Sequence, residues 1–111
     1  MEITERKQNG INIMGIQGRL DTSSAPELEA RLNALLDLHE KDYILDCREM
    51  EYISSSGLRV FLSLLKRTAQ MNGKLVLFGL SQSIAEIFTI AGFEKYFILK
   101  DDEAGALDYF Q

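Results

Sequence analysis

Two short, continuous apolar runs limit the folds that this chain can adopt. The runs Tyr43–Cys47 and Lys74–Phe78 each have the length of one buried strand. Strands without polar alternation are typical of parallel sheets whose faces are both covered by helices. Between the two runs, apolar residues recur at helical spacing, and this segment stops at Asn72-Gly73. The chain is therefore expected to alternate strands and helices around a mostly parallel sheet.

The N-terminal residues predict a β-hairpin. Ile3 and the charged residues after it form a weak strand that ends at Asn9-Gly10. That dipeptide is suited to a tight turn because both residues tolerate positive φ. A returning strand is expected from Ile11 to Gly18. The hairpin adds an antiparallel edge to the sheet.

Capping boxes predict two of the helices. Ser24-Ala-Pro-Glu27 and Ser83-Ile-Ala-Glu86 both place a glutamate three residues after a serine, an arrangement that satisfies free backbone donors. The first helix is expected to run to about His39, and the other to end at Gly92.

The C-terminal residues predict a last strand, Tyr96–Leu99, and a short final helix after Asp101 and Asp102. The predicted fold class is therefore α/β, a mixed sheet of about five strands that opens with an antiparallel hairpin, with about four helices. At 111 residues, the chain is expected to form one domain, residues 1–111.

Composition and charge exclude several classes of function. The net charge is −5, and the longest basic cluster is Lys66-Arg67, so no nucleic-acid partner is expected. Neither a long apolar segment nor a secretory signal is found, so no insertion into membranes is expected. The lone Cys47 is interpreted as a small core residue, and the compartment is therefore expected to be reducing and cytoplasmic.

The sequence contains few of the residues that an enzymatic site or a metal site needs. His39 is the only histidine, so neither a metal site nor a histidine-activated serine is expected, and no G-x-S-x-G motif occurs. The first strand ends at Gln8-Asn9-Gly10, which lacks the acidic pair of a phosphoaspartate receiver. No glycine-rich phosphate loop is present, so no cofactor is expected. The chain is predicted not to be an enzyme.

The stretch Ser54-Ser55-Ser56-Gly57 joins the first apolar run to the following helix. These serines either cap the helix or form a functional site, since open α/β sheets place ligands at the carboxyl ends of their strands. A phosphate there would face the helix dipole and stabilise the fold by about 1 kcal/mol. Roughly two added negative charges would repel a partner that accepts a neutral hydroxyl. The residues thus permit a switch without refolding.

Three segments form a recognisable set: Gly18-Arg-Leu-Asp21, Ile53-Ser-Ser-Ser-Gly-Leu-Arg-Val60 and Gly73-Lys-Leu-Val-Leu77. Together they resemble the STAS domain family, and more narrowly the bacterial anti-sigma-factor antagonists. The resemblance covers nearly the whole chain, with the segments in the family's order and spacing.

The resemblance implies a partner-switching role. In that family, the unphosphorylated antagonist binds an anti-sigma factor that is also a serine kinase, and this frees the sigma factor. Phosphorylation by that kinase breaks the complex, and a serine phosphatase reverses the modification. The family's acceptor maps to Ser55, two places before the glycine, with Ser54 and Ser56 as alternatives. Another possible role for such a domain is in a stress-signalling complex or as a soluble subunit of a membrane transporter.

The residues expected to contact the partner surround this acceptor: Asp21, Ser54, Ser56, Gly57 and Arg59. The alternative role for Asp21 is to cap a turn that leads to the first helix. Arg59 stands where some antagonists have a glycine, so it either alters partner choice or is a solvated helix residue.

Overall fold

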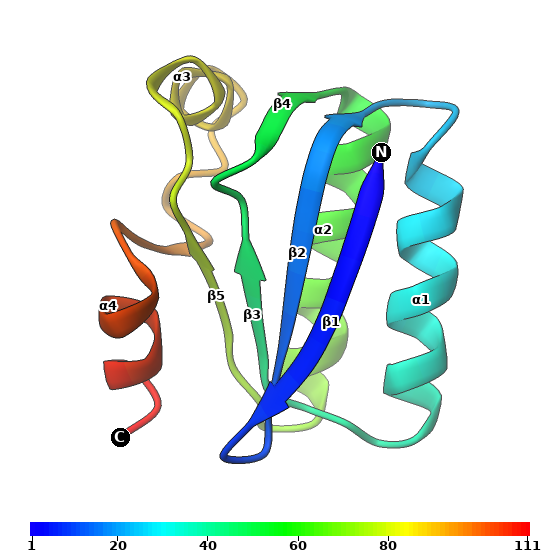
Figure 1. Cartoon of the computed structure of the whole chain (residues 1–111), viewed down its shortest axis with the longest axis vertical. Helices are drawn as coiled ribbons and strands as arrows, with labels where there is room; N and C mark the ends of the chain where they lie inside the picture. The colour runs from blue at the N-terminus through cyan, green and yellow to red at the C-terminus, as the bar shows by residue number, and fades with distance from the viewer.

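A mixed sheet with helices on both faces forms the framework of the computed structural model, which describes residues 1–111 (Figure 1). The strands are β1 (Glu2–Gln8), β2 (Ile11–Leu20), β3 (Tyr43–Asp46), β4 (Met50–Ile53), β5 (Leu75–Phe78) and β6 (Ile98–Lys100). The helices are α1 (Ala25–Asp37), α2 (Ser55–Gln70), α3 (Gln82–Ile90) and α4 (Glu103–Asp108). The main strand order is β1-β2-β3-β5-β6, and β4 pairs with the far end of β2. Only β1 and β2 pair antiparallel, which confirms the predicted fold class.

The hairpin turn forms where the sequence predicts it. Asn9 and Gly10 have φ values of 53° and 79°, as a two-residue hairpin turn requires. Strand β2 does not end at Gly18, however, but continues to Leu20. Gly18 has a φ of 91° and lies at a bulge where β2 stops pairing with β3 and begins to pair with β4. The glycine therefore marks a bend in the strand rather than its end.

The central strands are buried on both faces, as predicted. Every residue of β5 and the first three of β3 are buried. One face packs against α1, α2 and α3 in a core of 21 buried residues. The opposite face forms a smaller cluster of six buried residues that includes Ala106 of α4. Cys47 belongs to the larger core, where burial raises the pKa of its thiol, so its interpretation as a core residue is confirmed.

Both predicted capping boxes are wrong. The Ser24 hydroxyl caps no amide of α1, because it donates to the Arg19 carbonyl at 2.8 Å and accepts from the Asp21 amide at 2.9 Å. Helix α3 begins two residues earlier than the serine–glutamate pair suggests. Its cap is Ser81, whose side chain accepts from the Ile84 amide at 3.3 Å.

Strand β4 is absent from the sequence prediction. Its four residues, Met-Glu-Tyr-Ile, are too few to show the alternation that predicts a strand. The strand is defined by its pairing with β2. Helix α1 ends at Asp37, and His39 follows in the left-handed region with a φ of 64°. None of the four helices combines the length and hydropathy needed to cross a membrane.

Candidate functional site

The site lies where the ends of two neighbouring strands meet. Strands β2 and β4 run parallel, so their carboxyl ends reach the same edge of the sheet. The Ser54 amide donates to the Leu20 carbonyl at 2.9 Å and fixes this edge. Beyond it, β2 leads into the Asp21 loop and β4 leads into α2, at the upper end of the molecule in Figure 1. Two segments far apart in the sequence are thereby brought together.

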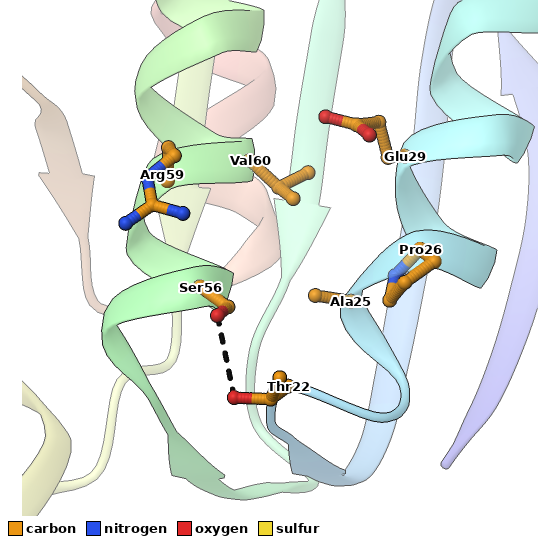
Figure 2. A pocket seen from close by; sticks show the side chains of 7 residues that line it. All are labelled: Thr22, Ala25, Pro26, Glu29, Ser56, Arg59 and Val60. Atoms are coloured by element: carbon orange, nitrogen blue, oxygen red, sulfur yellow. Dashed lines mark hydrogen bonds between the residues drawn. The ribbon is translucent and has the colours of Figure 1, made fainter.

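The three consecutive serines have different environments. Ser54 is the N-cap of α2, and its hydroxyl oxygen accepts from the Gly57 amide at 3.3 Å. The Ser56 hydroxyl lies 3.3 Å from the Thr22 hydroxyl, which links α2 to the loop before α1 (Figure 2). Ser55 is the first residue of α2, is exposed and takes part in neither bond. Of the three hydroxyls, only that of Ser55 is free of the contacts that hold the site together.

Gly57 lets α2 approach the strand ends closely. It is buried, and a Cβ atom on it would lie 2.8 Å from side-chain atoms of both Leu20 and Ile53. Such a distance is far below van der Waals contact between carbons. The absence of a side chain at this position therefore sets the distance between the serines and the sheet edge.

Asp21 caps its own loop. Its Oδ1 accepts from the Ser23 hydroxyl at 2.8 Å and from the amides of Ser23 and Ser24 at 3.1 and 3.2 Å. The Ser23 hydroxyl first, and then the Ser24 amide, hold the pKa of this carboxyl below its ordinary value. Its other oxygen, Oδ2, lies 3.9 Å from Nε of Arg19. The prediction that Asp21 caps a turn is confirmed. The contact between this loop and the serines of α2 is made by the next residue, Thr22.

Two hollows flank the first turns of α2. The first lies between α1 and α2 and measures about 270 Å³ (Figure 2). The second, about 300 Å³, lies between α2 and the end of α3. Residues lining the first are Thr22, Ala25, Pro26, Glu29, Ser56, Arg59 and Val60. Residues lining the second are Ser55, Leu58, Arg59, Leu62, Ala91 and Phe93.

Arg59 lines both hollows and is the only basic residue in either. Its side chain is exposed and makes none of the ion pairs in the structure. Glu29 is the only acidic residue among the lining residues. The site thus presents one unpaired cation between a polar hollow and a mainly apolar one.

The structure brings together all the residues that the sequence singles out: Asp21 in the loop, Ser54 as the cap, and Ser55, Ser56, Gly57 and Arg59 on α2. Sequence reasoning missed Thr22, although its position beside Asp21 was a signal. It also missed Ala91 and Phe93. The local sequence gives no signal for these two residues, because only the packing of the end of α3 beside α2 brings them to Ser55.

Chemically, the arrangement suits modification of a hydroxyl better than catalysis by one. A nucleophilic serine needs an adjacent base, and the only histidine, His39, follows the C-terminal end of α1. A phosphate on Ser55 would instead face the unpaired amides and positive dipole end of a sixteen-residue helix.

Comparison with known proteins gives a consistent result. The family model of the STAS domain matches residues 2–106. A Bordetella bronchiseptica protein that bears the name anti-sigma factor antagonist BtrV is 37% identical over 111 residues, which cover the whole of this chain and 96% of that protein. The anti-sigma-B factor antagonist of Listeria monocytogenes is 32% identical over 103 residues, covering 93% of this chain and 90% of the relative.

Solved structures share the fold at low sequence identity. An anti-sigma factor antagonist from Thermotoga maritima has a TM-score of 0.92 at 15% identity, covering 96% of this chain and 92% of its own. The Bacillus protein SpoIIAA has been solved without and with phosphorylation. The unphosphorylated form has a TM-score of 0.79 at 14% identity, covering 98% of this chain and 97% of its own. The phosphorylated form has a TM-score of 0.78 at 15% identity, covering 99% of this chain and 100% of its own.

Proposed function

The chain belongs to the STAS domain family, and we propose that it is an anti-sigma factor antagonist whose partner binding is switched off by phosphorylation of Ser55. Two relatives that match more than nine-tenths of this chain carry that functional name. Such a protein is a regulator rather than an enzyme. These relatives favour the antagonist role over a STAS module in a stress-signalling or transporter assembly.

The exposure of the Ser55 hydroxyl carries the proposal. A kinase must bring this oxygen in line with the γ-phosphorus of ATP. The hydroxyls of Ser54 and Ser56 are engaged in contacts that hold α2 to its surroundings, whereas modification of Ser55 breaks no such contact. Ser55 is therefore the acceptor that the geometry favours.

The phosphorylation step itself is supplied by the partner. A bond forms between the Ser55 oxygen and the γ-phosphorus, the bond to the β-phosphate oxygen breaks, and ADP leaves. The serine proton passes to a base of the anti-sigma factor kinase. A serine phosphatase then transfers the phosphoryl group to water and restores the hydroxyl.

The folded chain accommodates this group with little change. A dianion at the first position of α2 is stabilised by the helix dipole and by free amides. The effect of the phosphate is therefore exerted on the partner rather than on the core.

Release of the partner follows from charge. Ser55 borders the hollow formed with Leu58, Leu62 and Phe93, where a partner would exclude water. Burying a phosphate there costs its desolvation free energy and adds repulsion from any facing acid.

Among the other proposed contact residues, Asp21, Ser54, Ser56 and Arg59 have accessible side chains. Gly57 is buried, so it acts by positioning α2.

A displacement assay tests the antagonist function. The purified chain is added to a preformed complex of a sigma factor and the anti-sigma factor encoded in the same genome. Unmodified chain is expected to take the sigma factor's place, so that size-exclusion chromatography shows free sigma factor and a new complex. A sigma factor that stays bound in the presence of excess chain would contradict the proposed function.

A further inference from the structure

We propose that Arg59 binds the phosphate of phosphorylated Ser55 within the same chain. This inference rests on the proposed function and concerns the regulation of the same site. Ser55 and Arg59 lie four residues apart on α2 and line one hollow together. Residues at this spacing are neighbours on a helix surface, with Cβ atoms about 5–6 Å apart.

The direction of the two side chains favours the contact. Side chains of a helix tilt toward its N-terminus, so Arg59 leans back over the turn that begins with Ser55. Figure 2 shows its guanidinium on the side of the first turn of α2, which carries Ser56. An acidic group that precedes a basic one by four residues is also the more stabilising order in a helix.

No acid within the chain competes strongly for this guanidinium. Glu29 of α1 lines the first hollow but does not form an ion pair with Arg59. The segment after α3 contributes only Ala91 and Phe93 to the second hollow. The Asp21 carboxylate is held by Ser23 and Ser24. Arg59 is therefore a free cation, and its planar fork of donors matches the oxygens of a phosphate.

Pairing would affect the switch in two ways. The guanidinium favours the doubly charged phosphate, so it lowers the phosphate pKa and keeps the modification dianionic at neutral pH. It also removes from the docking surface a cation that is open to the partner before phosphorylation. Phosphorylation thus adds negative charge and withdraws positive charge at the same place.

A titration of the phosphate by ³¹P NMR tests the pairing. Phosphoserine is incorporated at position 55 during translation, so the test needs neither the kinase nor the partner. In Arg59→Gln, the midpoint of the chemical-shift titration is expected to rise by about 0.5 pH unit at low salt, which corresponds to the loss of one close ion pair. Arg59→Lys keeps the charge and is expected to restore most of the lower midpoint.

Lys66→Gln is the matched control, because it removes the same charge from an exposed position on the same helix. Lys66 is eleven residues from Ser55, about 16 Å along the helix axis, so the midpoint is expected not to change. Equal midpoints in the wild type and Arg59→Gln would overturn the pairing, as would an equal rise in Lys66→Gln or no restoration by Arg59→Lys. Such a result would leave the proposed function standing, since partner release requires only the phosphate.

Discussion

Ser55→Glu is expected to weaken binding to the anti-sigma factor by about 100-fold or more, because a carboxylate would have to be desolvated at the interface and would repel facing acids. The side chain at this position lies beside the apolar surface of Leu58, Leu62 and Phe93. In the free protein, the same carboxylate lies at the positive end of the α2 dipole. The melting temperature is therefore expected to stay the same or to rise slightly.

Isothermal titration calorimetry with the anti-sigma factor measures the affinity, and thermal unfolding measures the stability. Ser55→Ala is expected to bind as the wild type does. Ser63→Glu places the same charge at another exposed position of α2 and is expected to lower the affinity by less than about tenfold. Unchanged affinity of Ser55→Glu would show that negative charge at Ser55 does not control binding.

Gly57→Val is expected to destabilise the protein by about 3 kcal/mol, the upper end of the usual cost of overpacking a core. The new Cβ would lie 2.8 Å from atoms of Leu20 and Ile53, and two further methyl groups would enlarge the clash. Relief requires α2 to move away from the sheet edge. The serines would then be displaced as well, so weaker partner binding is expected in the folded fraction.

Urea unfolding monitored by circular dichroism measures this loss, and Ser63→Val is its control. It introduces the same β-branched residue into the same helix at an exposed position, where little loss of stability is expected because serine and valine have nearly equal helix propensities. Similar stabilities for Gly57→Val and Ser63→Val would show that the close approach at Gly57 is not required.

The sequence was most informative where a pattern reports directly on burial. The apolar runs that become β3 and β5 identify the centre of the sheet because both of their faces are covered. Asn9-Gly10 identifies the hairpin because few dipeptides adopt its backbone angles. Such features depend on residues close together in the chain, so the sequence alone reveals them.

Features that depend on distant partners were missed or misplaced. Strand β4 exists because β2 bends at Gly18 and offers it a pairing edge. The capping box at Ser24 fails because the Ser24 hydroxyl bonds to the Arg19 carbonyl and the Asp21 amide instead of to α1. Likewise, the serine motif identified the site, but only the fold shows which of its hydroxyls are engaged. The contact between Ser56 and Thr22 spans 34 residues and has no local signature.

Incubation of the chain with ATP and its anti-sigma factor kinase, followed by intact-mass analysis and peptide mapping, tests most directly whether Ser55 is the acceptor. The account predicts the addition of a single phosphate, mapped to Ser55, and no modification of Ser55→Ala. Full modification of Ser55→Ala, or a phosphate mapped to Ser54 or Ser56 in the wild type, would contradict it.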